Sequence, residues 1–398
     1  MRETHEENRR MLSSTPAQAS LRELAYLFLR LGTTAFGGPA ARIAMMEDEV
    51  VRRRRWLSRE TFLDLLGATN LIPGPNSTEM AIHIGHQRAG WAGLVVAGGC
   101  FILPAACITL AFAWAYVHLG SLPQAGGFLY GVKPVIIAVV VQALWRLGQS
   151  ALKTIRLTVI ALLAAAANFL GMNELIVPCG AGVITALVDH LTNDARTVPS
   201  VLSIVGLGAP LLVNGGGVAN ATAVTPFGLI SLFLFFVKVG TILFGSGYVL
   251  LAFLRADLVD RWRWLTEAQL LDAIAVGQMT PGPVFTTATF IGYVLGGTTG
   301  AVVATGGIFL PAFLFVALSR PLIPRLRRSA TAGAVLDGVN VASLALMAVV
   351  AWHLGRAAVV DGMTAVLALV SAVLLTRFRL NSAWLVLGGG LVGLSLRH

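Results

Sequence analysis

Two basic residues of this 398-residue chain, Arg30 and Lys238, lie inside apolar segments, each six residues before a Phe-Gly pair. A cation in an apolar segment is costly unless it is paired or reaches water, and it is by default a candidate for function. Two such cations that meet in the interior would attract a dianion. The alternative is that each long side chain reaches the membrane surface and has no role in binding.

Glycine and proline interrupt the apolar segments at four places. Phe36-Gly37-Gly38-Pro39 has the counterpart Phe244-Gly245-Ser246-Gly247, and Pro73-Gly74-Pro75 has the counterpart Pro281-Gly282-Pro283. Broken backbone at membrane depth is tolerated only where it is buried in protein or lines a watery cavity. A helix that begins at such a break points unpaired N–H groups inward, and these suit an anion. The alternative is that the breaks are only kinks and close helix contacts.

Polar side chains beyond these breaks would add donors. Lys133 matches Asn340 of the second half, so it would contact an anion from the first half only. The complete predicted binding set is Arg30, Phe36, Gly37, Gly38, Gly74, Asn76, Ser77, Thr78, Lys133, Lys238, Phe244, Gly245, Ser246, Gly282 and Thr286.

Glu79 lies on the helix that Pro75 is expected to start, and Thr287 stands at its place in the second half. An unpaired carboxyl beside the site could couple proton movement to binding, or it could make a structural hydrogen bond. His83 and His86 follow on the same helix and are candidates for handling protons or for a polar lining. A metal site would need more ligands than the sequence offers, and no cofactor is expected.

These candidates belong to a duplicated unit. Residues 31–148 recur at 239–355 with a one-residue gap, and the match extends to Arg55-Trp56-Leu57-Ser58 with Arg263-Trp264-Leu265-Thr266. Asp64 also matches Asp272. These carboxylates could cap a helix, form a salt bridge or take part in transport itself. Two matching halves with broken apolar segments at equivalent places indicate a secondary transporter.

Composition sets the class. The chain is 56% hydrophobic and 12% charged, with a mean hydropathy of +0.78, and it is long enough for ten or more crossings. Charge-free runs cover 89–132, 197–237 and 273–319, each longer than the roughly 20 residues that one helix needs to span a membrane. We therefore expect an all-α polytopic membrane protein. The net charge of +10 lies in short connections, as positive-inside topology requires, so no nucleic-acid partner is expected.

The chain divides into a polar tail at 1–20, a first repeat at 21–196, a Gly-rich apolar stretch at 197–225 and a second repeat at 226–398. The stretch at 197–225 either lies on the membrane as a linker or adds one crossing. The polar tail has no apolar core of the kind that a cleavable signal peptide needs.

The arginine distribution predicts that the halves are inverted. The connection 47–60 holds Arg52, Arg53, Arg54, Arg55 and Arg59, and its counterpart 255–267 holds only Arg255, Arg261 and Arg263. The connection 118–127 has no Lys or Arg, whereas its counterpart holds Arg320, Arg325, Arg327 and Arg328. Placing the richer connection of each half in the cytoplasm puts equivalent loops on opposite sides. Residues 61–88 would then form a re-entrant hairpin or a pair of spans.

Phe-Gly-Gly-Pro at 36–39, Arg-Trp-Leu at 55–57, Pro-Gly-Pro-Asn at 73–76 and Leu-Pro at 103–104 occur in this order and recur with changes in the second half. In this the chain resembles the long, two-domain form of the chromate ion transporter family. The resemblance implies export of chromate, an anion similar to sulfate, across the bacterial cytoplasmic membrane, which gives chromate resistance. Pro39 and Asn76 become Gly247 and Val284, so the first half is expected to contribute more to the site.

Export is also what the energetics favour. A dianion leaving a cell with a negative interior gains about 4.6 kcal/mol per 100 mV. The chain has no phosphate-binding G-x-x-x-x-G-K-[ST] loop, and it lacks the H-E-x-x-H and G-x-S-x-G motifs of membrane enzymes, so an enzyme is not expected. The hypothesis is alternating access of two halves around a midplane site. Uptake or exchange of sulfate or another oxyanion, an intramembrane enzyme and a receptor are the alternatives. The sequence leaves the oligomeric state open, a homodimer among the options.

Overall fold

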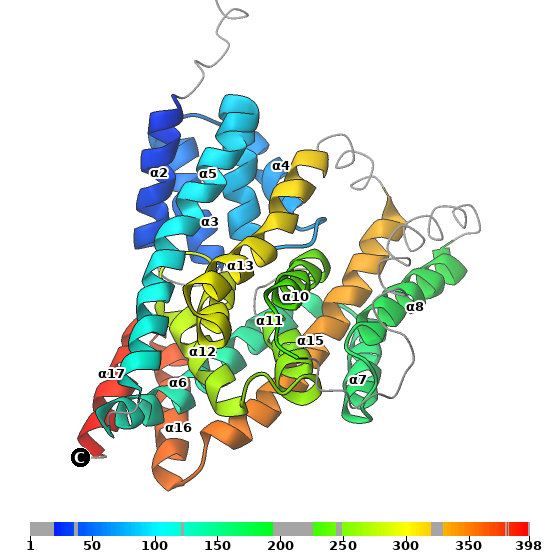
Figure 1. Ribbon diagram of the computed structural model, residues 1–398. Helices are drawn as coiled ribbons and strands as arrows, with labels where there is room; N and C mark the ends of the chain where they lie inside the picture. The colour runs from blue at the N-terminus through cyan, green and yellow to red at the C-terminus, as the bar shows by residue number, and fades with distance from the viewer. Residues whose placement is uncertain are drawn as a thin grey trace, which may run out of the picture.

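The computed structural model describes residues 20–35, 39–120, 123–193, 226–243, 249–319, 329–378, 380 and 382–396. Within these ranges all regular structure is helical (Figure 1), so the predicted all-α class is confirmed. Six residues of the predicted binding set fall outside the described residues, as do the stretch 197–225 and nearly all of the tail 1–20; they are Phe36, Gly37, Gly38, Phe244, Gly245 and Ser246.

The described helices fall into the two predicted halves. The first half contains α2 (Leu21–Thr34), α3 (Pro39–Glu47), the π-helix η1 (Asp48–Arg53), α4 (Arg59–Thr69), α5 (Asn76–Leu119), α6 (Pro123–Ala151), α7 (Ile155–Phe169) and α8 (Ile176–Asn193). The second contains α10 (Leu229–Ile242), α11 (Leu250–Leu254), the π-helix η2 (Arg255–Arg261), α12 (Glu267–Met279), the 3₁₀-helix η3 (Val284–Thr286), α13 (Thr287–Ser319), α15 (Ala330–Ala358), α16 (Gly362–Arg377) and α17 (Ser382–Leu396).

The two longest helices are bent back on themselves. A straight helix of the 44 residues of α5 would measure about 66 Å, roughly twice the hydrocarbon thickness of a bilayer. Its helical angles fail at Ala89 and Gly90, where Gly90 has a φ of 58°. A Cβ on Gly85 would overlap the backbone of Gly93, so the two arms cross in contact. α5 therefore consists of two arms that meet at Ala89 and Gly90, and α13 repeats the bend at Gly296 and Gly297.

Local irregularities recur at equivalent places in the two halves. Arg55 and Arg263 both have positive φ angles, 52° and 55°, a conformation that costs a non-glycine residue roughly 1 kcal/mol. Each follows a π-helix, and each precedes a helix capped by a hydroxyl side chain, Ser58 for α4 and Thr266 for α12. The duplication seen in the sequence therefore extends to the backbone.

The last helices of each half pack on the other half. The first-half helix α6 packs against α16 and α17, and the second-half helix α15 packs against α7 and α8 (Figure 1). A Cβ on Gly131 of α6 would overlap the backbone of Gly389 of α17. Close backbone approach at small residues is how membrane helices gain packing contacts, so this exchange joins the two halves.

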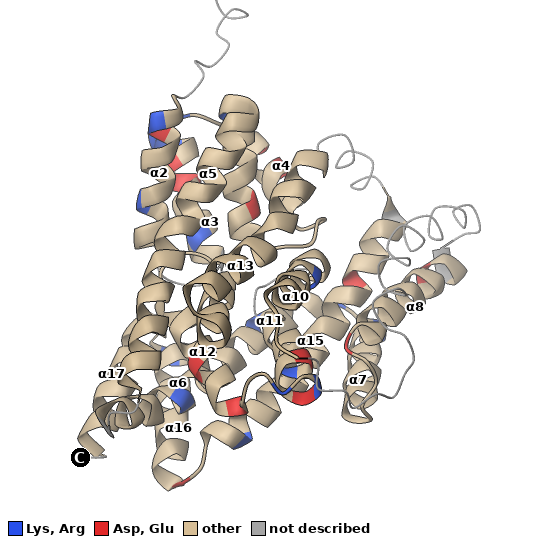
Figure 2. Ribbon diagram, viewed as in Figure 1, with Lys and Arg blue, Asp and Glu red and all other residues tan. Residues whose placement is uncertain are grey.

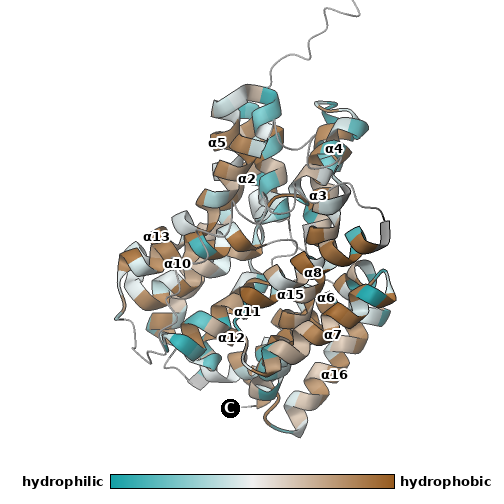
Figure 3. Ribbon diagram, turned by 90° about the vertical axis from the view of Figure 1, so that its right-hand side faces the viewer, coloured by the Kyte–Doolittle hydropathy of each residue, from teal (hydrophilic) through white to brown (hydrophobic). Residues whose placement is uncertain are grey.

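The outer surface is apolar. Leu162, Leu163, Leu369 and Leu391 are exposed on the outer helices, and Figure 2 shows few charged residues along the long helices. In Figure 3, hydrophilic residues gather at the top of the view, around the upper end of α4 and the bend of α5. In the described part of the chain, four helices are long and apolar enough to cross a membrane: α5, α6, the helix from Val284 through α13, and α15. The chain is therefore a multi-pass membrane protein.

Candidate binding site at the crossing of the two halves

Each Pro-Gly-Pro turn is held by the end of the first helix of the opposite half. The amide N of Gly74 donates to the carbonyl O of Leu243, at 2.6 Å, and the amide N of Gly282 donates to that of Ala35, at 3.3 Å. Leu243 is the C-cap of α10 and Ala35 is the C-cap of α2, each directly before a Phe-Gly break. The two Pro-Gly-Pro turns therefore meet the C-caps of α10 and α2 in two reciprocal contacts, which we call the Leu243 crossing and the Ala35 crossing.

Glycine is required at these crossings for two reasons. Gly74 and Gly282 have φ angles of 140° and 87°, which side chains disfavour. Their surroundings also leave no room. A Cβ on Gly282 would lie 2.7 Å from the Cβ of Ala105, and one on Gly74 would overlap the carboxyl of Glu79. The prediction that the Pro-Gly-Pro turns interrupt helices is confirmed, since α5 begins at Asn76 with Pro75 as its N-cap.

The Leu243 crossing carries buried polar atoms without partners. Glu79 is fully buried, and neither carboxyl oxygen has a hydrogen-bond partner among the described residues. The same holds for Asn76 Oδ1, Thr78 Oγ1 and His83 Nε2, whereas Asn76 Nδ2 donates to Asn70 at 2.7 Å. Buried polar atoms are nearly always paired, so a group of unpaired ones needs an explanation, such as water or a ligand. Ser77 is buried on the same turn.

The equivalent hydroxyls of the second half are already used. Thr286 Oγ1 donates to the carbonyl of Pro283 at 2.9 Å, and Thr287 Oγ1 donates to that of Val284 at 2.8 Å. Both hydroxyls donate within the tight turn formed by η3 and its C-cap Thr287. A 3₁₀-helix has fewer residues per turn than an α-helix. Thr286 was predicted as a donor to the anion, but in this conformation its hydroxyl is engaged. The asymmetry agrees with the greater contribution expected from the first half.

Arg42 is a buried cation that the sequence patterns did not reveal. It lies on α3, is 4% exposed, and its Nε is 3.5 Å from the carbonyl O of Ala35, the atom that also accepts from Gly282. Leu250 stands at its place in the second half. One signal was present, since Arg42 follows the Phe-Gly-Gly-Pro break closely and has no counterpart. The Ala35 crossing thus holds a cation and the Leu243 crossing holds an acid.

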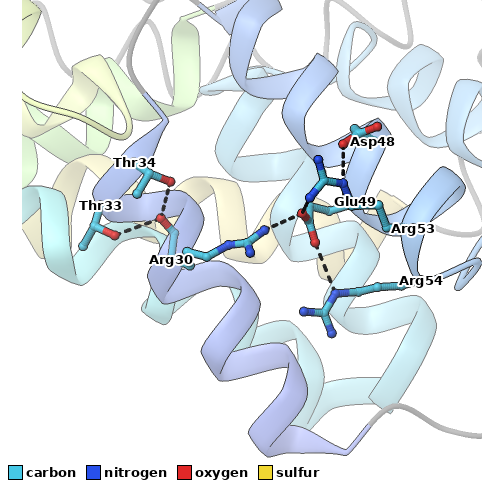
Figure 4. A network of polar contacts seen from close by, with 7 residues as sticks. All are labelled: Arg30, Thr33, Thr34, Asp48, Glu49, Arg53 and Arg54. Atoms are coloured by element: carbon cyan, nitrogen blue, oxygen red, sulfur yellow. Dashed lines mark hydrogen bonds and ion pairs between the residues drawn. The ribbon is translucent and has the colours of Figure 1, made fainter.

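Arg30 and Lys238, the predicted anion-binding cations, each have a carboxylate partner. Arg30 forms an ion pair with the buried Glu49, and Lys238 Nζ lies 2.7 Å from Asp257 Oδ2. Figure 4 shows the first network, in which Arg53 and Arg54 also approach Glu49, both at 3.4 Å.

Glu49 and Asp257 occupy equivalent places at the starts of η1 and η2. The duplication could therefore have revealed both partners. A binding role for Arg30 and Lys238 stays a prediction, and an anion would have to compete with these carboxylates.

The network of the second half contains a further acid. Glu174, between α7 and α8, lies 3.7 Å from Arg261, which also forms an ion pair with Asp257. Burial and the nearby charge of Asp257 raise the pKa of Glu174, and Arg261 opposes this only in part. Through Glu174, a connection of the first half contacts η2 of the second.

Lys133 pairs with Asp272 across the two halves. Its Nζ lies 3.2 Å from Asp272 Oδ1, and Tyr116 donates to Asp272 Oδ2 at 3.0 Å. Of the roles considered for Asp272, the structure shows the salt bridge, and Asp272 is buried, whereas the equivalent Asp64 is exposed. The predicted contact of Lys133 with an anion stays a prediction, because its charge is already balanced by Asp272.

The remaining predicted residues, His83 and His86, lie on the first arm of α5. His83 is buried, and the ring of His86 packs edge-on against Trp91 with the centroids 5.5 Å apart. Positions three and four apart share a helix face, so Glu79, His83 and His86 form a polar row from the Leu243 crossing toward the bend at Gly90.

Comparison with known proteins agrees with the duplicated architecture. The family model described as Chromate transporter matches twice, at residues 22–186 and 230–394. The chain is 32% identical over 389 residues to a chromate transport protein of Cupriavidus metallidurans, covering 94% of this chain and 93% of that protein. It is 32% identical to a chromate transport protein of Pseudomonas aeruginosa, over 96% and 93% of the two chains.

A probable chromate transport protein of Synechococcus elongatus is 31% identical to this chain, with 89% of each protein covered. No solved structure matches the chain significantly. The family match includes both repeats and nearly every described helix. The chain therefore belongs to the chromate transporter family.

Proposed function

We propose that this protein exports chromate across the cytoplasmic membrane of a bacterium and so confers chromate resistance. Two of the relatives named above are chromate transport proteins, and the match to this chain covers 93% of each of them. This similarity supports chromate as the substrate. The observation that carries the proposal is the reciprocal pair of crossings, with Arg42 buried at the contact of Ala35 and Gly282.

The chemistry of the crossings suits a tetrahedral dianion. The start of α5 leaves the amide N–H groups of Asn76 and Ser77 outside the helical ladder, because the first paired amides are those of Thr78 and Glu79 on the Pro75 carbonyl. Such amides and the positive end of the helix dipole attract an anion. The guanidinium of Arg42 offers a planar set of donors that matches two oxygens of an oxyanion.

The mechanism we propose is alternating access of the two halves around these crossings. In Figure 1, α5 ends at the bottom of the view, whereas the equivalent helix α13 ends at the top, as inverted repeats would require. The packing of α6 and α15 on helices of the opposite half would keep the halves together as they rock. The Lys133–Asp272 pair would contribute to the same contact. The membrane potential supplies the driving force, about 4.6 kcal/mol per 100 mV for a dianion.

Sulfate is the second candidate substrate. Arg42 and backbone amides recognise charge and tetrahedral shape, and sulfate shares both with chromate. The same site would then serve uptake or exchange of sulfate. Competition between the two anions distinguishes a site selective for chromate from a general oxyanion site.

The test is uptake of labelled chromate into everted membrane vesicles that contain this protein. We expect accumulation to increase when a potential positive inside is imposed, and to fall with excess sulfate if the site recognises only charge and shape. Vesicles without the protein are the control. Absence of accumulation by correctly folded protein at every potential would contradict chromate export.

A further inference from the structure

We propose that Glu79 carries a proton whenever the start of α5 binds an oxyanion, so that proton and anion move together, with His86 and His83 as the route of the proton. This inference rests on the proposed function and specifies the coupling ion of the same site. It assigns a role to the buried acid of the Leu243 crossing, which anion binding alone leaves unexplained.

The first argument is the position of Glu79. The carboxyl lies over Gly74, where a Cβ would overlap it, so it sits against the Pro-Gly-Pro turn at the start of the helix. Residues three apart on a helix lie about 5–6 Å apart, which places Glu79 within one turn of the amides of Asn76. An ionised Glu79 would repel a dianion at this distance, whereas the neutral acid can donate a hydrogen bond to it.

The second argument is the lack of compensation. Glu79 is fully buried, and both oxygens are without a hydrogen-bond partner among the described residues. Burying an unpaired carboxylate is far more costly than burying a neutral acid. In the conformation seen here, the protonated form is therefore the one that these surroundings accept.

The charged groups on neighbouring helices do not change this conclusion. The helices packed against α5 include α2, α3, α4, α12 and α13. The ionisable residues of these helices include Arg30, Arg42, Asp64, Asp272 and Tyr293. Arg30 and Asp272 are paired with Glu49 and Lys133, and within the described ranges no ion pair joins any of them to Glu79.

The third argument is the row of side chains that leads away from Glu79. His83 is one turn further along α5, and His86 is three residues beyond it and partly exposed. Histidine accepts and releases protons near neutral pH. In the second half Thr287 replaces Glu79, and α13 contains no histidine. Among the described residues, α5 therefore has a row of this kind and the equivalent helix α13 does not.

The coupled step is balanced as follows. A proton leaves the aqueous phase, passes through the imidazole nitrogens of His86 and His83, and bonds to a carboxylate oxygen of Glu79, while one oxyanion enters from the same side. After the halves rock, both leave on the other side. The net charge moved with a dianion is then one negative charge, so the membrane potential drives the coupled step with half the force stated above for a dianion alone.

The test measures proton uptake on binding. Purified full-length protein in weakly buffered solution receives sodium chromate, while a pH indicator reports protons and tryptophan fluorescence reports binding. At a pH where free Glu79 is ionised, we expect about one proton to be taken up per chromate bound. Above that pH, the affinity for chromate should fall by up to tenfold per pH unit. Glu79→Gln should bind chromate without proton uptake and with an affinity that no longer follows pH. Protein-free chromate gives the correction for protonation of the ion itself.

Glu60→Gln, on the exposed face of α4, is the matched control and should keep the proton uptake of the unaltered protein. Chromate binding with equal proton uptake in Glu79→Gln, or with none in the unaltered protein, would overturn the inference and leave the proposed function standing. Lack of chromate binding by all variants would instead remove the proposed function. If Glu79→Gln does not fold, the pH dependence of affinity in the unaltered protein decides, and a pH-independent affinity overturns the inference.

Discussion

Glu49 and Asp257 balance the charges of Arg30 and Lys238. Each cation would be costly in an apolar environment if it stood alone, and each has a buried carboxylate within ion-pair distance. Removal of one member of a buried pair leaves an uncompensated charge, which costs more than the pair itself contributes. The first expected role of these pairs is therefore to fasten α2 to η1 and α10 to η2.

Asp257→Asn tests this role. Asp257 is fully buried between Lys238 and Arg261, so the substitution should lower stability by about 3 kcal/mol, visible as a lower Tm of the purified protein in detergent. A second change, Lys238→Met, should recover part of the loss. Asp260→Asn on the same π-helix, whose side chain is 49% exposed, is the control. An unchanged Tm for Asp257→Asn would show that the pair is not structural.

The site was only partly predictable from the residues. The positions of Gly74, Gly282, Asn76 and Glu79 could be predicted because glycine and proline interrupt helices for local steric reasons. The partners of Arg30 and Lys238 do not follow from local sterics, because each ion pair depends on how two helices pack. The equivalent positions of Glu49 and Asp257 in the two repeats were the available signal. Arg42 was missed because its burial depends on tertiary packing, which no local pattern reveals.

At the scale of helices, small residues decide how the halves join. Gly131 of α6 and Gly389 of α17 touch through their backbones, and larger side chains would force the helices apart. Gly126 lies earlier on the same helix, and a Cβ added there would meet nothing within 4 Å. An added side chain would therefore meet α17 at Gly131 and open space at Gly126.

Gly131→Leu should separate α6 from α17 and lower stability by about 2 kcal/mol or more. Gly126→Leu should leave stability nearly unchanged, since its side chain would point into open space. The yield of monodisperse protein after extraction and its Tm measure both effects. Equal behaviour of the two variants would argue against the exchanged packing of the last helices.

Helix positions were predictable where apolar runs end at proline or glycine, as at the bend that separates the two arms of α5. The π-helices η1 and η2 were not, because their residues, such as Asp48–Arg53, have ordinary helical propensities. The 3₁₀-helix η3 follows the Pro-Gly-Pro turn of the second repeat, which is one residue shorter than the first. A 3₁₀-helix rises further per residue than an α-helix, so η3 lets the shorter repeat cover the same distance with one residue fewer.

At the scale of the molecule, the two halves interlock. α6 and α15 each pack on the terminal helices of the opposite half, and the two crossings are reciprocal. The sequence predicted two equivalent halves from their repeated residues. It could not predict the exchange, because the apolar faces of α7, α8, α16 and α17 would fit either half equally well.

Inversion of the halves can be tested with matched cysteines. Ser58 and Thr266 are exposed helix caps at equivalent positions. After replacement of Cys100, Cys107 and Cys179 by alanine, a membrane-impermeant maleimide should label Thr266→Cys in intact cells. It should label Ser58→Cys only in everted vesicles, because the arginine-rich connection is cytoplasmic. Labelling of both from one side would exclude inverted repeats.

The most direct test of the oxyanion site is chromate accumulation by Arg42→Gln in everted vesicles under an imposed potential, at equal amounts of folded protein. The site at the crossings predicts a loss of at least about tenfold, since a charge-assisted contact contributes roughly 1.5–3 kcal/mol, with partial recovery in Arg42→Lys. Arg59→Gln, whose side chain is 75% exposed, should accumulate chromate like the unaltered protein. Undiminished accumulation by Arg42→Gln would contradict a chromate site at the Ala35 crossing.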